Sequence, residues 1–412
     1  MSLTTDMLIP ARAAEFRAAM DAAGVVDPVA RGGGSVYLGQ IGCRTRIADN
    51  LSAVNTQAMH RRADFARDVV ASIQIVYGNF YTDTTSEISP AGSRTIASAI
   101  EYPAGVMNRV KFAGADSVAI ASGQAQQVSD VLAITIPKGA QFWVHTWQQA
   151  ASGVMTFASQ LSSAALGDQA LLGAADGTAS TAWLSGAAFG GGSFGPYAII
   201  ANTRRASSAV IGDSRACNAT ATSSVTNYGG SISPSIAPFI PVLDLSRGTQ
   251  AAMNWVAGGG AKRLTYLVYV SHVVLELGIN DVIQLQEAAQ ILASRQVIRA
   301  LGNAVNPALI WFETTLEPVS TSTDAWVTVP NQTTSTRNGR RVPFNEQVRA
   351  GNLGFEGYFE LADRVESSRN SGKWKAPPMV EAAITGDGTH AIAVGYALQD
   401  GAVEPRRFTR AA

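Results

Sequence analysis

Two stretches of this sequence carry residue types that could activate a hydroxyl group as a nucleophile. Ser214 ends the tripeptide Gly-Asp-Ser, directly after the apolar run 208–211. A serine attacks well only when a base takes its proton, and a histidine with a pKa near neutrality suits that task. His390 has Asp387 three residues before it, an offset that lets the carboxylate hold the ring tautomer. We therefore predict Ser214 as nucleophile, His390 as general base and then acid, and Asp387 as the orienting group.

These residues must be positioned by strand ends and by a segment that folds over them. Ser214, Gly248 and Asn280 each follow an apolar segment that favours a strand. The carboxyl ends of parallel strands meet at one edge of a sheet, so we expect these three residues to lie close together. His390 precedes the helix-like segment 391–399, which could fold over the same edge.

Together the four stretches resemble the SGNH hydrolases, the GDSL-type esterases and lipases. Blocks of that family contribute Ser, Gly, Asn and His in this order, matched here by Ser214, Gly248, Asn280 and His390 over about half of the chain. The resemblance implies a flavodoxin-like, three-layer α/β domain with a parallel sheet. It also implies an oxyanion hole made by the backbone N–H groups of Ser214 and Gly248 and the side-chain amide of Asn280. If Gly248 is not the donor, a neighbour within 246–249 takes that role.

Arg215 is the visible departure from the family, which usually has Leu or Ile there. That position usually faces the core or the pocket wall. We therefore expect Arg215 to help decide which acyl group fits.

Short strand-like segments separated by turn residues fill the chain from about residue 35 to residue 150, without intervening helices. They are Val70–Tyr77, Thr95–Tyr102, Val106–Phe112, Ser117–Ala121, Val131–Ile136 and Gln141–Trp147. In the first, alternation should bury Ala71, Ile73, Ile75 and Tyr77. The segment 61–69 adds a short helix or an extended entry. This pattern predicts an all-β sandwich or jelly roll, similar to the N-terminal modules of carbohydrate esterases.

After Pro196, apolar strand candidates alternate with stretches long enough for helices, which predicts a parallel sheet covered on both faces. The strand candidates are Tyr197–Ile200, Ala209–Ile211, Phe239–Leu245, Leu267–Leu277 and Ala308–Phe312, and the helix candidates are Gly248–Val256 and Asp281–Ala300.

The predicted division of the chain has three parts. Residues 1–34 form an amphipathic helix (10–23) and a linker, residues 35–204 the sandwich, and residues 205–412 the hydrolase domain. A Gly- and Ala-rich connector near 151–195, with a helix near 164–174, ends the sandwich part.

Several features have a structural explanation that we favour. Gly191 to Gly195 spell Gly-x-Ser-x-Gly around Ser193, but that motif needs a strand before it and a helix after it, and Pro196 follows here. We also expect structural roles for the remaining histidines, His60, His145 and His272, and turn-stabilising roles for Asp213 and Asp281. The glycine-rich run 258–262 lacks the spacing of a phosphate-binding loop and is expected to be a turn.

Six aromatic side chains of the β-rich region leave two interpretations open. They are Tyr77, Phe80, Tyr81, Phe142, Trp143 and Trp147. Their rings could form a sugar-stacking platform, but we favour a place in the sandwich core.

Composition excludes several classes of function. The formal net charge is zero, so no field attracts a polyanion and nucleic acid is not an expected partner. Cys43 and Cys217 are expected to be separate buried thiols, and no metal-ligand spacing or cofactor motif is present. No apolar run spans a bilayer. No signal peptide is visible, which favours the cytoplasm unless a leader was removed.

The residues and the resemblance together predict a serine esterase that acts through an acyl-serine intermediate. The expected substrate carries short acyl groups, O-acetyl above all, on a carbohydrate. A lipase or thioesterase for longer chains, an acyltransferase, and a non-catalytic carbohydrate-binding protein are the alternatives. The oligomeric state is left open.

Overall fold

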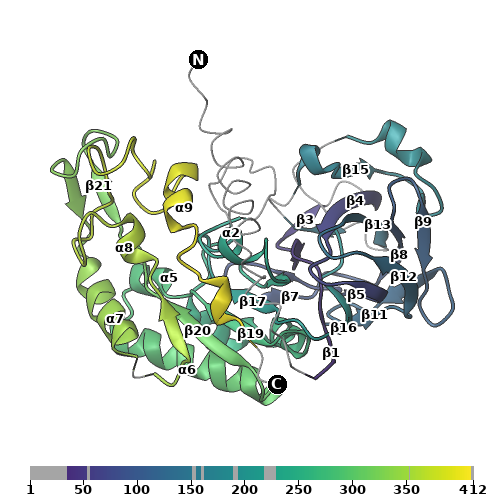
Figure 1. Ribbon diagram of the computed structural model, residues 1–412, viewed down its shortest axis with the longest axis horizontal. Helices are drawn as coiled ribbons and strands as arrows, with labels where there is room; N and C mark the ends of the chain where they lie inside the picture. Colours follow the sequence, from purple (N-terminus) through teal and green to yellow (C-terminus); the bar gives the residue numbers. More distant parts are fainter. Residues whose placement is uncertain are drawn as a thin grey trace, which may run out of the picture.

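The computed structural model describes residues 35–52, 56–150, 155–158, 162–188, 194–217, 229–351 and 353–409. The helix expected at 10–23 and Ser193 lie outside the described residues. A β-rich half (purple to blue in Figure 1) lies beside an α/β half (green to yellow). None of the helices in the described ranges is long and apolar enough to cross a membrane.

Two antiparallel sheets build the β-rich half. The first has the order β1 (Tyr37–Gln40), β16 (Ala198–Thr203), β5 (Val70–Tyr77) and β11 (Gln127–Val128), with β12 (Leu132–Ile136) also paired to β5. The second has the order β10 (Ser117–Ile120), β8 (Arg94–Glu101), β13 (Gln141–Ala150), β4 (Gln57–Phe65) and β15 (Gln169–Leu172), with β9 (Met107–Val110) paired to β8. Two short pairs complete it, β3 (Asn50–Ser52) with β14 (Met155–Phe157), and β6 (Tyr81–Thr82) with β7 (Glu87–Ile88). All six expected strands are present, and much of the segment 61–69 belongs to β4.

Burial along β5 departs from the predicted alternation at one end. Ile73, Ile75 and Tyr77 are buried as expected, but Ala71 is exposed and Val70 is buried instead. The register between β5 and β12 shifts near this end, and such an irregularity changes which side chains face the core.

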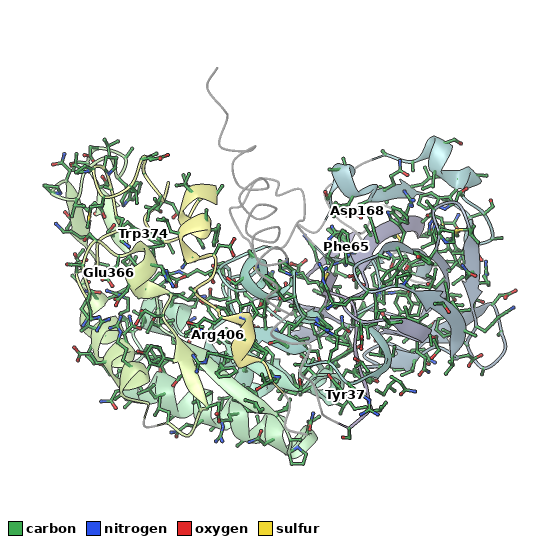
Figure 2. The ribbon with its side chains drawn as sticks, viewed as in Figure 1. Tyr37, Phe65, Asp168, Glu366, Trp374 and Arg406 are labelled. Atoms are coloured by element: carbon green, nitrogen blue, oxygen red, sulfur yellow. The ribbon has the colours of Figure 1, made fainter. Side chains whose placement is uncertain are left out.

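The helix expected at 164–174 does not form. A single 3₁₀ turn, Ala164–Leu166, ends at Gly167, and β15 follows. Asp168, labelled in Figure 2, accepts hydrogen bonds from the backbone N–H groups of Ser163 (2.8 Å) and Ala63 (2.7 Å) and pairs with Arg44 (2.8 Å). The contacts with Ala63 and Arg44, which are distant in the sequence, favour pairing of the segment after Asp168 with β4 over a helix.

Six parallel strands form the sheet of the α/β half. Their order is β2 (Thr45–Arg46), β18 (Val242–Asp244), β17 (Ser208–Ile211), β19 (His272–Leu275), β20 (Ile310–Thr314) and β23 (Gly357–Phe359). Without β2, this is the flavodoxin-like order, whose direction reverses between β17 and β19. The predicted parallel sheet is confirmed, with two differences. The candidate strand 197–200 belongs to β16 of the antiparallel sheet, and β2, from within residues 35–204, joins the parallel sheet by pairing with β18.

Side chains from both faces of this sheet are buried. Ala209 and Val273 pack on one face in the same core as Ala252, Trp255 and Ile298, whereas Val210 and Val274 pack on the other with Ile236 and Phe408. The helices are α2 (Ser233–Ile236), α3 (Ala252–Asn254), α4 (Ala261–Leu264), α5 (Ile279–Ile283), α6 (Ala288–Val305), α7 (Asn338–Ala350), α8 (Ala362–Val365) and α9 (Ala393–Gln399). A short hairpin, β21 (Ser320–Ser322) and β22 (Gln332–Thr334), extends beyond β20. Thus the sheet is covered on both faces.

Several predicted elements are shorter than expected. The candidate strand 267–277 is β only over β19, because Tyr266 and Tyr269 lie on a 3₁₀ turn and their hydroxyls donate to Ala125 O (2.5 Å) and Gln126 Oε1 (2.8 Å) of the β-rich half. The candidate helix 281–300 is divided between α5 and α6, with Leu285 at a φ of 66° between them. The candidate helix 248–256 begins only at residue 252, in α3.

The aromatic side chains do not form a common platform. Tyr77, Phe80 and Phe142 are fully buried in the core, as favoured. Trp143 and Trp147 are half-buried, and their indole N–H groups donate to Leu166 O (2.8 Å) and Ala174 O (2.9 Å) of the chain that covers them.

Candidate active site

The turn that carries Ser214 follows β17, next to the reversal of strand order. Asp213 N–H donates to Glu276 Oε2 (2.9 Å), Asp213 Oδ1 accepts from Arg215 N–H (3.0 Å), and Ser214 is 7% exposed. A Cβ on Gly212 would stand 2.4 Å from Ala216 Cβ, so only glycine fits at the start of this turn. The two hydrogen bonds of Asp213 stabilise the turn, as expected.

Ser214, His390 and Asp387 form one continuous chain of hydrogen bonds. Ser214 Oγ lies 2.8 Å from His390 Nε2, and His390 Nδ1 lies 2.7 Å from Asp387 Oδ2. A carboxylate can only accept, so Nδ1 carries the proton and Nε2 is left to accept from the serine. Asp387 Oδ1 also accepts from His390 N–H (2.7 Å), which fixes the carboxylate relative to the ring.

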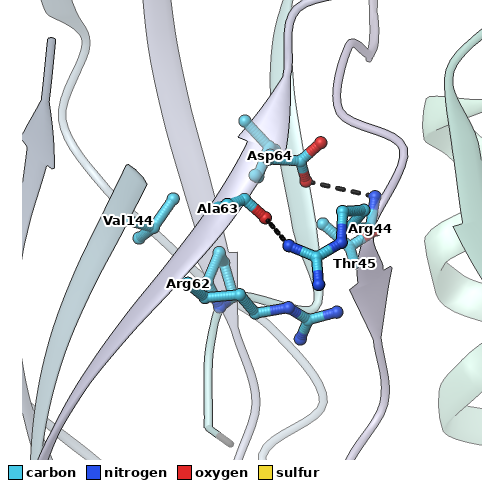
Figure 3. Close-up of a pocket in the computed structure, with 8 residues that line it drawn as sticks. Arg44, Thr45, Arg62, Ala63, Asp64 and Val144 are labelled. Atoms are coloured by element: carbon cyan, nitrogen blue, oxygen red, sulfur yellow. Dashed lines mark hydrogen bonds between the residues drawn. The ribbon is translucent and has the colours of Figure 1, made fainter. Parts of the chain in front are cut away.

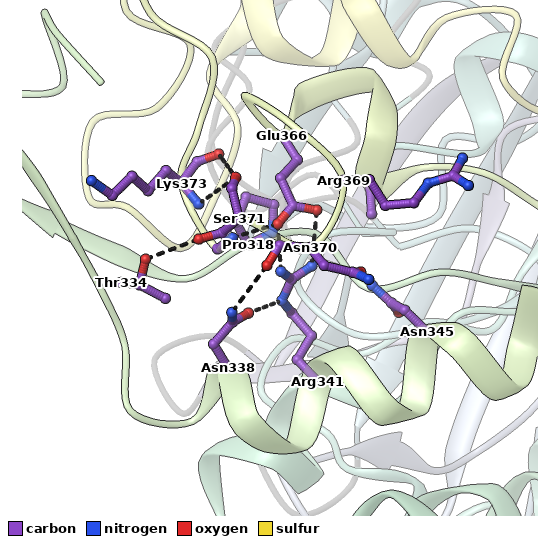
Figure 4. A network of polar contacts seen from close by, with 12 residues as sticks. Pro318, Thr334, Asn338, Arg341, Asn345, Glu366, Arg369, Asn370, Ser371 and Lys373 are labelled. Carbon is purple, nitrogen blue, oxygen red and sulfur yellow. Dashed lines mark hydrogen bonds and ion pairs between the residues drawn. The ribbon is translucent and has the colours of Figure 1, made fainter. Parts of the chain in front are cut away.

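The loop of His390 is held on both sides. Gly388 has a φ of 72°, and a Cβ there would lie 1.8 Å from Ser320 O. Its carbonyl accepts from the indole N–H of Trp374 (2.9 Å; Trp374 is labelled in Figure 2). Thr385 Oγ1 donates to His390 O (2.7 Å). A polar network centred on Arg341 and Glu366 lies beside the segment that leads to Trp374 (Figure 4).

Gly248 lies next to the nucleophile. A Cβ on it would be 3.8 Å from Ser214 Cβ. Among the described residues, neither the N–H of Gly248 nor that of Ser214 has a hydrogen-bond acceptor. Thr249, the next residue, is β-branched and has a φ of 65°, a left-handed conformation that is costly for such a side chain. Two backbone donors are thus left open beside the serine hydroxyl.

Asn280 reaches the same place from the first turn of α5. Its Nδ2 donates one hydrogen to Gln250 O (3.1 Å), two residues beyond Gly248, and the other hydrogen has no acceptor among the described residues. Asp281 accepts from the backbone N–H groups of Ala252 (2.7 Å) and Met253 (3.0 Å) at the start of α3. The block around Asn280 therefore fixes the loop of Gly248, and Asp281 has the structural contacts expected of it.

Burial and hydrogen bonds shift the carboxyl groups in opposite directions. Burial opposes ionisation of Asp387, but the hydrogen bonds from His390 and Thr389 prevail and lower its pKa. Burial raises the pKa of Asp213 to about 7, although Arg215 opposes this, and burial also raises the pKa of Glu276 well above its ordinary value. The carboxylate that contacts the histidine thus stays charged, whereas those behind the serine favour the neutral form.

Arg215 faces the core, one of the two surroundings expected at its position. Its side chain is buried, and the guanidinium contacts Thr389 O, the carbonyl of Pro318, and both the carbonyl and the carboxylate of Glu317. No local sequence pattern indicates these contacts, since the partners lie more than 100 residues away along the chain.

The other histidines have structural partners. His145 Nε2 pairs with Glu101 Oε2 (2.7 Å), and His272 Nδ1 lies 2.8 Å from Ser271 Oγ. His60 is fully buried, which lowers its pKa to about 4. Cys43 and Cys217 are buried thiols that form no disulfide.

Within the described residues, no group of three or more His, Cys, Asp or Glu side chains could hold a metal ion. A cavity of about 10 Å³ lies in the β-rich half between Arg44, Arg62 and Asp64 (Figure 3). It has room for about one water molecule, which is too little for a substrate.

No protein-family model and no curated protein matches the sequence. Among solved structures, the chain is similar to a peptidoglycan O-acetylesterase, with 11% identity and a TM-score of 0.40 over 89% of this chain and 73% of that one. It is also similar to an active-site mutant of a family two carbohydrate esterase from Clostridium thermocellum, with 10% identity and a TM-score of 0.31 over 89% and 95% of the two chains. A third is a protein from Desulfitobacterium hafniense described as lipolytic and of the G-D-S-L family, with 15% identity and a TM-score of 0.35 over 49% and 98%.

Because the identities and TM-scores are low, we draw the function from the geometry of the side chains.

Proposed function

We propose that this protein is a serine esterase that hydrolyses short acyl esters through an acyl-serine intermediate. The observation that carries the proposal is the continuous chain of hydrogen bonds from Ser214 through His390 to Asp387, beside three N–H groups for which the described residues provide no acceptor. Ser214, His390 and Asp387 are the proposed catalytic residues, and no metal or cofactor takes part in the proposed reaction.

In the first step, Ser214 Oγ attacks the ester carbonyl while His390 Nε2 takes its proton. The carbonyl oxygen becomes an oxyanion, which accepts from the N–H groups of Ser214 and Gly248 and from Asn280 Nδ2. His390 then protonates the leaving alcohol. Water, activated by the same histidine, releases the acid and restores Ser214. Asp387 stabilises the imidazolium and holds its orientation throughout.

The proposed substrate carries an O-acetyl or similarly short acyl group on a carbohydrate. Little of Ser214 is exposed, and Gly248 lies against it, which favours a small acyl group. The hairpin β6–β7 adjoins the site through a hydrogen bond from Arg247 Nε to Thr82 O (3.0 Å). Its exposed tip carries Thr84 and Thr85, polar side chains that suit a leaving group rich in hydroxyls.

We propose that the two halves of the chain have different roles. The β-sandwich of residues 35–204 would hold the alcohol part of the substrate, and residues 205–412 with β2 would form the hydrolase unit. Jelly-roll topology of the sandwich is part of this proposal.

The test is release of acetate from a panel of acetylated glycans, together with p-nitrophenyl esters of increasing chain length. We expect the highest kcat/KM for acetyl esters, no turnover by Ser214→Ala, and covalent labelling of Ser214 by a fluorophosphonate. Ser231→Ala is the matched control, because it removes a buried hydroxyl that has no partner among the described residues. Unchanged hydrolysis by Ser214→Ala would refute the proposal.

Three other results would point to the alternative functions. A maximum for long acyl chains would indicate a lipase or thioesterase. Transfer of acetyl groups to a second sugar would indicate a transferase, and glycan binding without turnover would indicate a binding protein.

A further inference from the structure

We infer that Arg215 is a positioning residue that holds the loop of His390 against the turn of Ser214. The inference rests on the proposed function and adds a residue that the four sequence stretches do not include. Arg215 directly follows the nucleophile, and Thr389, whose carbonyl accepts from Arg215 Nε (3.1 Å), directly precedes the base. One side chain thus joins the two segments that must meet for the proton transfer.

The guanidinium uses most of its N–H groups for contacts with this part of the chain. Nη1 donates to Glu317 O (3.0 Å) and Glu317 Oε2 (2.8 Å), and Nη2 donates to Pro318 O (3.1 Å). With the bond to Thr389 O, four of its five N–H groups have partners in the protein. Arg215 is 1% exposed, and the carboxylate of Glu317 offsets its charge. The side chain is therefore placed to act through His390 and not to touch substrate.

Glu317 fixes the guanidinium in turn. Its second oxygen, Oε1, accepts from Gln399 Nε2 (2.8 Å) at the end of α9, the helix that follows His390. The chain on both sides of the base is thereby held to the same ion pair, once through Thr389 and once through Gln399. The planar guanidinium binds four acceptors here in fixed directions, whereas a lysine ammonium has only three N–H groups on a single atom.

The contacts of Arg215 should affect the rate of the reaction and not only the stability of the fold. A nucleophile and base held at 2.8 Å need their two loops fixed to a fraction of an ångström, and a displacement near 1 Å can cost ~100-fold in rate. Losing the Arg215 fork should therefore lower kcat while KM changes little, since no substrate contact is removed.

Two variants test this, and neither leaves a buried charge without a partner of opposite charge. Arg215→Lys retains the charge beside Glu317 but not the fork. Arg215→Met combined with Glu317→Gln removes both buried charges and keeps an amide that can bond to Gln399. We expect both to lower kcat by about 10- to 100-fold, and to slow fluorophosphonate labelling of Ser214 similarly, with KM within about threefold of the wild type. The matched control is Arg44→Met combined with Asp168→Asn, which removes a buried ion pair of the β-rich half.

The outcomes are distinguishable from failure of the proposed function. If the wild type has no esterase activity, the proposed function itself fails. If the wild type is active and either folded variant keeps its kcat, the positioning role is overturned. A raised KM with unchanged kcat would also overturn it, because Arg215 would then contact substrate, as would an equal loss of kcat in the Arg44 and Asp168 control. Should the double variant not fold, the kcat of Arg215→Lys decides.

Discussion

Replacing Asn280 by alanine should lower kcat far more than it lowers stability. Asn280 Nδ2 has one hydrogen on Gln250 O (3.1 Å) and one without an acceptor among the described residues, so the variant removes one of three proposed oxyanion donors. Loss of such a donor typically raises the barrier by ~2.7–4 kcal/mol, which is a decrease in kcat of roughly 10²- to 10³-fold. The lost bond to Gln250 O should cost only about 1 kcal/mol of the free energy of unfolding.

Steady-state kinetics with p-nitrophenyl acetate and urea unfolding measure the two effects separately. Asn303→Ala is the matched control, because Asn303 is also half-buried and its Oδ1 accepts one hydrogen bond, from Trp311 Nε1 (2.7 Å). It should cost a similar amount of stability and leave kcat unchanged. A kcat of Asn280→Ala within about threefold of the wild type, or a loss confined to KM, would show that Asn280 does not stabilise the oxyanion.

Three further predictions concern the base and the buried carboxyl group. Asp387→Asn should lower kcat by roughly 10⁴-fold without unfolding the protein, since an amide can hold His390 in the wrong tautomer; kcat near the wild-type value would exclude the orienting role. The raised pKa of Asp213, about 7, means that the folded state binds this proton more tightly than the unfolded state. Its contribution to stability is therefore fully present below the ordinary pKa of 3.8 and is lost as pH rises through about 7. Asp213→Asn should flatten the decline in urea stability between about pH 4 and pH 7, and an equal slope would contradict this. Gly388→Ala should abolish activity, because Gly388 has a φ of 72° and an added Cβ would collide with a backbone carbonyl. Gly386→Ala should be tolerated, because the nearest atom to an added Cβ there is 3.9 Å away. Equal activity of the two glycine variants would contradict the strained geometry.

The sequence was most informative where chemistry depends on short, local patterns. Ser214 and Asn280 follow apolar strands, and Asp387 lies three residues before His390, so each can be recognised from the few residues around it. The structure brings Ser214 and His390 within hydrogen-bonding distance, and no described residue accepts the backbone N–H of Gly248 or the second amide hydrogen of Asn280. Their roles in catalysis stay predictions until the variants are measured.

Features that depend on distant partners could not be predicted. The contacts of Arg215 are one case, because its carbonyl and carboxylate partners lie far along the chain. The alanine-rich stretch 164–174 favours a helix by composition, but Asp168 binds Arg44 and the backbone of β4, which directs Gln169–Leu172 into a sheet. Local propensity was outweighed by tertiary contacts in this stretch.

The strand β2 matters for any attempt to produce residues 205–412 without the β-rich half. It pairs with β18, and Arg46 at its end donates to Cys217 O (3.2 Å), at the end of the nucleophile turn. A chain that began at residue 205 would lack this strand, leaving β18 as an unprotected sheet edge, a surface that invites aggregation. The β-rich half thus supplies an edge strand to the sheet that carries Ser214, and any shortened chain must include the segment that carries β2.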